Sequence, residues 1–421
     1  MDPRLITPAM DRRNGLLYLA TYLFIYLAAP VSYIGVVQAA LCDKLGASAT
    51  IANLPSATYL LGGFAPLLLS LVVPHRWAQR VVVCANGLTA FFLGLVCLTL
   101  AARLPAWIPL TVLIAQGLLQ GFTASTAQVF TFQCLARGTT IDGRNRAFQK
   151  TYFLTPVCAV GGSLGAQHIL NGGFPAVRFP NDFAMLYAIG FVCMTAVTGF
   201  SMMYQLAPLA DEPRVPLFQH LAESVRDYSR SRALVLLFLV YVLWNCALSI
   251  TPNLSLYTRE VLGRDPKELS GLIMAVRFGC KSIGGYLLGA IALRYGLRSS
   301  VMTASLLLAA GTVWGWGVPG YAFLLAFGFL GGGELGGAYI PNYGVSLSRA
   351  ENTARNVSLL TLAQPVSSFS PALFGFLADR WGFGASFCLA LLMALAAVYL
   401  TLRIRAAAEK REPTMQAGPG R

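Results

Sequence analysis

Long apolar runs separated by short polar breaks cover most of the 421-residue chain. Charges, prolines and Gly-Asn pairs divide these runs into segments long enough to cross a bilayer, which takes roughly 20 apolar residues in a helix. The pattern predicts twelve membrane-spanning helices, and an even number of spans places both termini on one side of the membrane. The expected spans are residues 15–41, 51–73, 80–102, 107–135, 148–171, 183–207, 233–257, 268–293, 299–317, 320–347, 356–378 and 384–404.

Composition supports this interpretation, because 56% of the residues are hydrophobic and only 11% are charged. A soluble domain carries about 25% charged residues, so the composition excludes a soluble enzyme, a nucleic-acid-binding domain and a disordered chain. We therefore expect an all-α membrane protein. The nine cysteines are scattered and form no CxxC pair or Cys/His cluster, so we expect neither a disulfide framework nor a metal site. No cofactor is predicted.

The net charge of +14 is distributed unevenly along the chain. With both termini inside, the inner segments hold twenty-two Lys and Arg residues and the outer loops hold seven. Such a bias marks the cytoplasmic side of a membrane protein. We expect a multi-pass protein of the plasma (inner) membrane with both termini in the cytoplasm. Topology and attraction to anionic lipid account for the basic excess, so nucleic acid is not needed as a partner.

The longest inner segment divides the chain into two halves. It carries apolar residues at helical spacing, which predict an amphipathic helix in the headgroup region; they are Leu217, Phe218, Leu221, Val225 and Tyr228. The expected organisation is an N-terminal bundle over 1–206, a cytoplasmic linker over 207–232, a C-terminal bundle over 233–404 and a cytoplasmic tail over 405–421.

The two halves resemble each other. Arg146 precedes Pro156 by ten residues in the first half, and Arg355 precedes Pro365 by ten residues in the second, with an offset of 209. Two loop pairs repeat in the same order, Leu45-Gly46 with Leu262-Gly263 at an offset of 217 and the basic loops 76–80 and 294–298 at an offset of 218. Three matches in order predict a parallel internal repeat of a six-helix unit.

In these features the chain resembles the major facilitator superfamily over nearly its whole length. Family members carry a basic cytoplasmic loop of the form G-x-x-x-D-R-x-G-R/K after spans two and eight. The copy after span eight is Gly289–Arg298, with Leu293 in the acidic position, and the copy at His75–Arg80 also lacks the acid. A closer match, Gly375–Gly382, follows span eleven on the outer side, where we expect a turn. The resemblance implies two six-helix bundles, a cavity between them and transport by alternating access.

Three charged residues fall in the middle of the expected spans, away from their ends. Arg277 and Lys281 lie in the span 268–293 and are four residues apart, so they share one helix face. Glu334 lies in the span 320–347. At 1.5 Å per residue, the three are expected about 14, 20 and 21 Å below the outer edge, near the bilayer middle. A charge there costs about 2.5–3.5 kcal/mol, so partners or a function are expected.

Two interpretations of these charges stay open. In one, an ion pair only ties two spans together. In the other, the second cation, which one acid leaves unmatched, binds an anionic group of a solute such as a carboxylate or phosphate. Arg277 is also similar to the substrate-binding arginine in span eight of the monocarboxylate-transporter branch, although Ile273 occupies the position at which that branch has an acid.

Glu334 is the candidate proton-coupling residue. It is the only one of the 17 acidic residues expected near the bilayer middle, and glycines surround it in the stretch 331–337. Burial favours the neutral form of a carboxyl group, whereas a neighbouring cation favours the charged form. Protonation of Glu334 can therefore follow the competition between the solute and Glu334 for Arg277 and Lys281.

Neutral polar and aromatic residues provide further candidates for solute contacts. They fall on spans one, four, seven, ten and eleven, and spans one, four, seven and ten line the cavity in the resembling family. Polar contacts between membrane helices are common and worth only about 0.6 kcal/mol, so each residue alone has packing as its alternative role. The candidates are Tyr26, Tyr33, Gln116, Gln120, Trp244, Asn245, Asn342 and Gln364.

The predicted function is secondary transport of a small organic solute, anionic and carboxylate-like, with coupling to protons. An efflux transporter for drugs or metabolites is the alternative, and spans one and four lack the acids that would favour cationic compounds. An embedded enzyme is disfavoured because HExxH and GxSxG are absent and no histidine lies mid-span. A receptor or scramblase fits the same spans. Without a Walker A sequence, ATP is not expected to drive transport directly. We expect a monomer.

Overall fold

The computed structural model describes residues 6–207, 225–348 and 353–409, and these are helical without a β-strand. The first half comprises α1 (Pro8–Leu27), α2 (Ala29–Ser32), α3 (Val36–Lys44), α4 (Ala49–Gly62), α5 (Ala65–Val72), η2 (His75–Trp77), α6 (Ala78–Ala101), α7 (Trp107–Gly138), α8 (Ile141–Leu170) and α9 (Asn181–Met202). The second comprises α11 (Arg232–Leu248), α12 (Thr251–Leu256), α13 (Thr258–Leu262), α14 (Pro266–Tyr295), α15 (Leu297–Gly317), η3 (Gly320–Leu324), α16 (Leu325–Gly333), α17 (Gly336–Leu347), α18 (Thr353–Thr361), α19 (Ala363–Val366), α20 (Phe369–Trp381) and α21 (Phe383–Glu409).

Each predicted span coincides with one helix or with several short consecutive helices. Eight of the described helices or helix groups are long and apolar enough to cross a membrane, so the protein is a multi-pass membrane protein. They are α6, α7, α8, α9, Arg232–Leu256, Gly320–Leu347, Asn356–Trp381 and Phe383–Ile404. The full number of twelve spans, and their grouping into two bundles of six, stay predictions.

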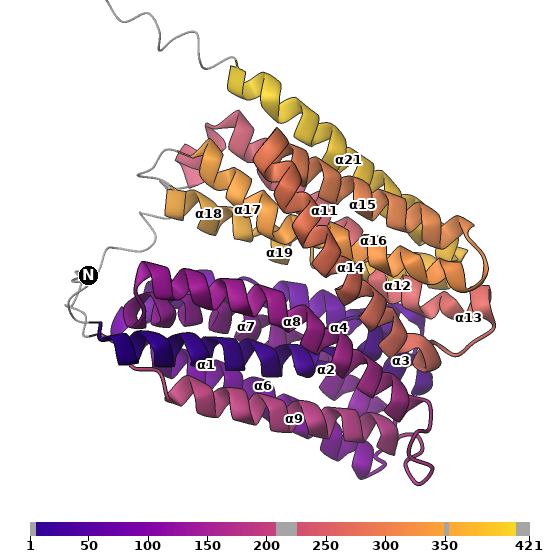
Figure 1. Cartoon of the computed structure of the whole chain (residues 1–421). Coiled ribbons are helices and arrows are strands. Elements are labelled where there is room, and N and C mark those ends of the chain that lie inside the picture. Colours follow the sequence, from indigo (N-terminus) through magenta and orange to yellow (C-terminus); the bar gives the residue numbers. More distant parts are fainter. Residues whose placement is uncertain (1–5, 208–224, 349–352, 410–421) are drawn as a thin grey trace, which may run out of the picture.

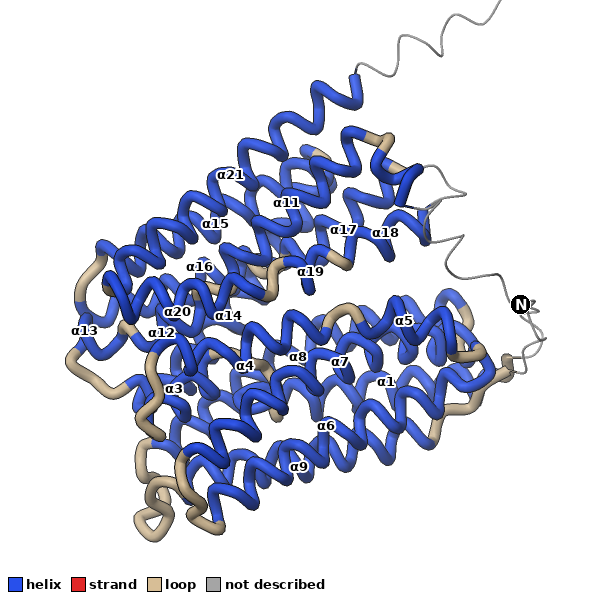
Figure 2. The backbone as a smooth tube through the Cα atoms, turned by 180° about the vertical axis from the view of Figure 1, so that it is seen from behind, coloured by secondary structure: helices blue, strands red, loops and turns tan. Residues whose placement is uncertain are grey.

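The helices form two groups (Figures 1 and 2). Helices α1–α9 make the N-terminal group, and helices α11–α21 make the C-terminal group. The groups approach each other at the end where α3 and α13 lie, opposite the N-terminus, and diverge toward the N-terminus. We call the end with α3 and α13 the distal end. There α14 packs on α8 and α20 packs on α4, and α12 and α14 also contact α3.

Two large apolar clusters, one centred on each group, form the core, and each includes residues of the other group. In the C-terminal group a large cluster includes Phe278, Phe327 and Phe387, all fully buried. In the N-terminal group a second cluster includes Leu93 and Tyr187. Because many other large apolar side chains are exposed, the outer surface matches a hydrocarbon environment rather than water.

Several predicted spans are interrupted. Span 15–41 is not one helix but α1, α2 and α3, with Tyr33 and Gly35 in the non-helical stretch before α3. Pro30 starts α2 without an N–H to donate, and Gly35 adopts φ 145°, which a side chain disfavours. The prediction of one continuous helix over 15–41 is therefore wrong: Tyr26 lies in α1, whereas Tyr33 lies outside it.

The predicted amphipathic linker helix falls largely outside the described residues, which omit 208–224. Residues 225–229 do form a short helix. Tyr228 is buried against Leu234 and Leu359, and its hydroxyl donates to the carbonyl of Leu234 at 3.0 Å. This part of the linker contacts the C-terminal group.

Candidate functional site

Two helices carry the three charges of the expected spans. Asp265 caps α14 by accepting a hydrogen bond from the Lys267 amide, and Arg277 and Lys281 lie in the middle of this helix. Glu334 follows α16, in the break before α17. Close approach of α16 to α14 needs Gly331, because a Cβ there would lie 2.2 Å from the carbonyl oxygen of Arg277. The glycine-rich stretch therefore brings Glu334 to α14.

Glu334 binds both cations. Lys281 Nζ lies 2.6 Å from Oε1, while Arg277 contacts Oε2 through Nε at 3.2 Å and Nη2 at 3.1 Å. The side chains are 5% exposed for Arg277, 19% for Lys281 and 9% for Glu334. We call these residues the charged triad. Its formal charge is +1, so one carboxylate is shared between two buried cations.

Aromatic rings from the N-terminal group cover the triad. The ring centre of Tyr33 lies 5.2 Å from Arg277 Cζ and 5.5 Å from Lys281 Nζ, which gives two cation–π contacts. Phe278 of α14 packs edge-on against both Tyr26 and Tyr33. Of the predicted solute-contact residues, Tyr33 therefore faces the charges directly, and Tyr26 packs against Phe278 next to them.

Sequence reasoning missed the residue that holds the break in which Tyr33 lies. Gln38 is fully buried, donates to the carbonyl of Val31 at 2.9 Å and accepts from the amide of Gly35 at 3.0 Å. These bonds satisfy backbone groups that the interrupted helix leaves free. Pro30 and Gly35 on either side of Tyr33 were the available signal for this break.

Two predicted glutamines of α7 connect to the same stretch. Gln116 is fully buried and donates to Gln120 Oε1 at 3.0 Å, and Gln120 donates to the carbonyl of Ser32 at 2.6 Å. Ser32 directly precedes Tyr33. The glutamines thus lie behind Tyr33 and anchor its backbone.

The remaining predicted residues divide into one that adjoins the triad and three that do not. Trp244 donates from Nε1 to the carbonyl of Gly333 at 3.0 Å, directly before Glu334. Asn245 donates to Tyr241 of its own helix at 2.9 Å, and Asn342 is exposed. The amide of Gln364 lies next to Gly63, on the N-terminal group. Within the described residues, the structure gives Asn245, Asn342 and Gln364 no contact with the triad.

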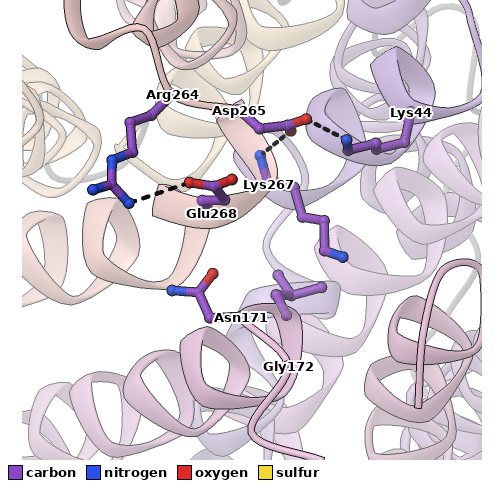
Figure 3. A pocket seen from close by; sticks show the side chains of 8 residues that line it. Lys44, Asn171, Gly172, Arg264, Asp265, Lys267 and Glu268 are labelled. Carbon is purple, nitrogen blue, oxygen red and sulfur yellow. Dashed lines mark hydrogen bonds and ion pairs between the residues drawn. The ribbon is translucent and has the colours of Figure 1, made fainter. Parts of the chain in front are cut away.

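A pocket lies at the distal end, separate from the triad (Figure 3). Its charged lining is already paired: Lys44 with Asp265, Arg264 with Glu268 at 3.4 Å, and Lys267 with Asp182. Since nine residues of α14 separate Glu268 from Arg277, the pocket lies about 14 Å along the helix from the triad. Among the described residues, no group of three His, Cys, Asp or Glu side chains could hold a metal ion.

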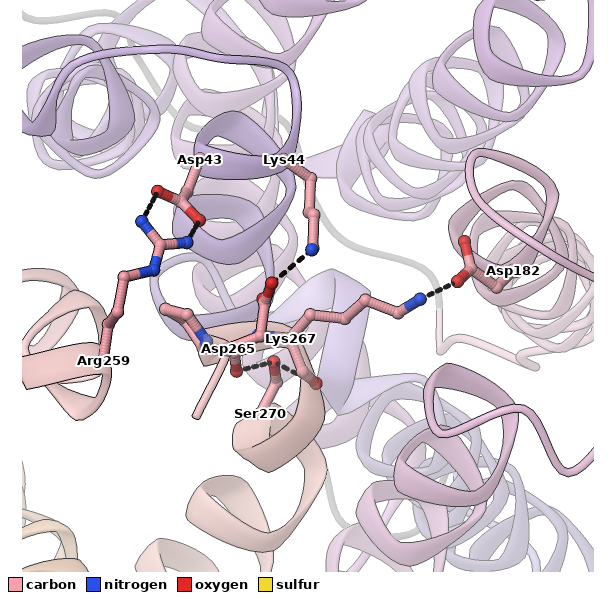
Figure 4. Close-up of polar contacts among 8 residues, drawn as sticks. Asp43, Lys44, Asp182, Arg259, Asp265, Lys267 and Ser270 are labelled. Atoms are coloured by element: carbon pink, nitrogen blue, oxygen red, sulfur yellow. Dashed lines mark hydrogen bonds and ion pairs between the residues drawn. The ribbon is translucent and has the colours of Figure 1, made fainter. Parts of the chain in front are cut away.

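Ion pairs join the two groups at this end (Figure 4). Arg259 donates to both oxygens of Asp43, at 3.0 and 2.5 Å, and the Lys44–Asp265 and Lys267–Asp182 pairs lie beside it. The hydrogen bond to Asp43 raises the pKa of Arg259 above its ordinary value. Every one of these three pairs links an N-terminal-group residue to a C-terminal-group residue.

Solved transporter structures share this fold. A variant of the nucleoside transporter NupG matches with a TM-score of 0.69 at 13% identity, covering 94% of this chain and 99% of that one. A D-xylose–proton symporter matches at 0.63 and 12% identity, covering 93% and 96%. A POT family transporter in complex with 5-aminolevulinic acid matches at 0.64 and 14% identity, covering 96% of each chain.

The chain has a transporter fold of the major facilitator type. The solved structures that share this fold are membrane transporters. No protein-family model and no curated protein matches the sequence. The sequence-based resemblance is thus confirmed at the level of the fold, and likeness to the monocarboxylate branch stays a prediction.

Proposed function

We propose that the protein is a secondary transporter that moves a small organic anion, carboxylate-like, by alternating access. The charged triad carries the proposal: two buried cations share one carboxylate, so the site holds a net positive charge inside the membrane. If the residues only paired to hold the helices together, each buried cation would be expected to have its own carboxylate. The likeness to transporters supports movement of a small solute, and one of those structures holds a carboxylic acid, 5-aminolevulinic acid.

In this proposal the solute competes with Glu334. Arg277 contacts Glu334 through two of its three guanidinium nitrogens, so further donors remain for a carboxylate in a bidentate arrangement. Lys281 supplies a second positive charge one turn away. Tyr33, Tyr26 and Trp244 surround the charges and are proposed to contact the uncharged part of the solute.

Proton coupling follows from the same competition. When the solute carboxylate takes the cations, Glu334 loses its partners in a buried place, where the neutral acid is favoured. A proton taken up by Glu334 then moves together with the anion. The proposal is therefore a symport in which one carboxylate replaces the other at Arg277 and Lys281.

Topology and organisation enter the proposal from the sequence. From the bias of Lys and Arg we propose that the protein lies in the plasma membrane and that both termini are in the cytoplasm. The divisions 1–206, 207–232, 233–404 and 405–421 and the parallel repeat are proposed with it, as is a monomeric state. The distal end then faces the outside of the cell.

The experiment has two steps. Purified protein is first screened by thermal shift against carboxylates, sugar acids, phosphates, nucleosides and drugs, and any stabilising compound is tested for uptake into proteoliposomes. Arg277→Ala is expected to lower uptake at least about 30-fold, since truncating one partner of a buried charge pair costs at least about 2 kcal/mol.

Two further variants sharpen this test. Arg277→Lys is expected to fail as well, because an ammonium group cannot reproduce the planar fork of the guanidinium. Arg403→Ala is the control, since Arg403 lies exposed on α21 of the same group, outside the triad and the basic loops. Normal transport by folded Arg277→Ala, or stabilisation by cationic drugs alone, would refute the anion site.

A further inference from the structure

Two contacts between the helix groups differ from the ion pairs beside them, because polar side chains bond to backbone atoms. The first joins α20 to α4. Asp379 accepts hydrogen bonds from the amides of Ala49 and Thr50, each at 2.9 Å, and from the Thr50 hydroxyl at 2.5 Å. These amides open α4 and have no partner within the helix, and a carboxylate is favoured at this positive helix end. Asp379 thus caps a helix of the other group.

Gly375 makes this contact possible. A Cβ at Gly375 would lie 2.6 Å from the carbonyl oxygen of Ala49 and 2.6 Å from the Cα of Thr50. Since Gly375 precedes Asp379 by one helical turn, both face α4. The stretch Gly375–Gly382, expected to be only an outer turn, is therefore a contact between the two groups.

The second contact joins α8 to α14. The side-chain amide of Gln167 accepts a hydrogen bond from the backbone N–H of Leu272 at 2.8 Å, and it donates one to the backbone carbonyl oxygen of Glu268. In α14 the N–H of Leu272 faces the carbonyl of Glu268, four residues earlier, as in any α-helix. The Gln167 side chain therefore bonds to both groups of one helical N–H···O=C pair. Gly271 lies at the crossing, where a Cβ would be 2.3 Å from the carbonyl oxygen of Ser163.

We propose that Asp379 and Gln167 are latches that hold the distal end closed, and that the Asp43–Arg259 pair beside them contributes little. Both latches act on backbone atoms at fixed positions beside a glycine that keeps the helices in contact. The Asp43–Arg259 pair instead depends on the long side chain of Arg259, which is 55% exposed. Exposed pairs are weak and are screened by salt. The inference concerns the closed arrangement and is independent of any solute.

Amide hydrogen exchange on the full chain in nanodiscs tests the proposal. Asp379→Ala frees the amides of residues 49–50 whatever its wider role, so the informative readout is the other latch, at residues 268–272. We expect exchange there to rise about fivefold, the equilibrium effect of losing a capping carboxylate worth about 1 kcal/mol. Gln167→Glu, which can accept from Leu272 but cannot donate to Glu268, should raise exchange at residues 49–53 in the same way.

Controls separate the latches from the ion pairs and from misfolding. Arg380→Ala removes an exposed charge next to Asp379 and should change neither latch. Arg259→Ala should change both by about twofold or less, and raising salt from about 0.1 to 1 M should leave both protected. Exchange in the core of α6 reports folding, and Gln167→Met replaces Gln167→Glu if the latter fails to fold. Changes confined to the mutated latch, or opening caused by Arg259→Ala or by salt, would overturn the proposal.

Discussion

The charged triad and the distal ion pairs use the same residue types in opposite ways. In the triad, Arg277, Lys281 and Glu334 all belong to the C-terminal group and are nearly buried. At the distal end, each pair joins one group to the other, and burial ranges from the exposed Arg259 to the nearly buried Asp182. Contacts inside one group persist when two rigid groups move, whereas contacts between groups must break. The comparison supports the proposals that the triad binds the solute and that the distal end opens.

Replacing the whole triad by apolar residues gives the largest expected effect. The variant Arg277→Met, Lys281→Met, Glu334→Leu removes the buried charges together. Such replacements are often neutral or stabilising, by about 1–4 kcal/mol. We therefore expect the melting temperature to be retained or raised while transport is lost completely. A folded triple variant that still accumulates the solute would remove the triad from the mechanism.

Removing only the acid should act differently. Glu334→Gln leaves two buried cations without a counter-charge, and breaking a buried pair costs about 3–5 kcal/mol. We expect a lower melting temperature that an anionic solute restores, because its carboxylate takes the place of Glu334. Exchange of solute across the membrane should continue, whereas accumulation driven by a pH gradient should be lost. Lys281→Ala, which removes one of the two cations instead of the acid, is measured beside Glu334→Gln for comparison.

Two results would contradict this account of Glu334. A stable Glu334→Gln variant with unimpaired pH-driven accumulation would show that the residue carries no proton. An unstable variant that no anion rescues would leave Glu334 as a structural partner of Arg277 and Lys281 alone.

The sequence located the triad better than it located the contacts around it. Helical spacing and depth were enough to place Arg277, Lys281 and Glu334 near one another, because the cost of a buried charge leaves few alternatives. The contacts among these three residues also lie within the C-terminal group, so they do not depend on how the two groups are oriented. The fold followed from the apolar runs, and its likeness to solved transporters confirms its type.

Contacts between groups were beyond the sequence. Lys44, Arg259 and Lys267 were counted only as outer-loop charges, since their partners depend on how the two groups are oriented. Asp379 was expected in a turn because nothing local reveals the start of α4 beside it. The break at Tyr33 was missed for another reason: Pro30 and Gly35 were visible, but the apolar run was continuous enough to suggest a single helix.

Tyr33 offers a smaller perturbation of the triad from the opposite group. Tyr33→Leu removes the ring that faces both cations, and a cation–π contact is worth about 0.5–2 kcal/mol. We expect solute affinity or transport to fall by a few-fold to about 30-fold at that value. Tyr33→Phe keeps the ring and should stay near wild type in proteoliposome uptake. Equal losses in both variants would mean that the hydroxyl, rather than the ring, matters.

The smallest effect is expected for Arg259→Ala at the distal end. The pair with Asp43 is partly exposed, so its loss should change the free energy of unfolding by about 1 kcal/mol or less. Because the hydrogen bond to Asp43 raises the pKa of Arg259, the stability that the pair contributes is fully present below the unfolded-state pKa and is lost as the pH rises through the folded-state pKa, in strongly alkaline solution. The difference in melting temperature between wild type and Arg259→Ala should therefore be the same at about pH 7 and 10, and should vanish at about 1 M salt, where screening is strong. Arg380→Ala, at the same end, should show no such salt-dependent difference. If the difference in melting temperature disappears at the higher pH, a group other than Arg259 titrates and controls this pair. If the difference persists at high salt, the pair belongs with the latches and not with the weak surface contacts.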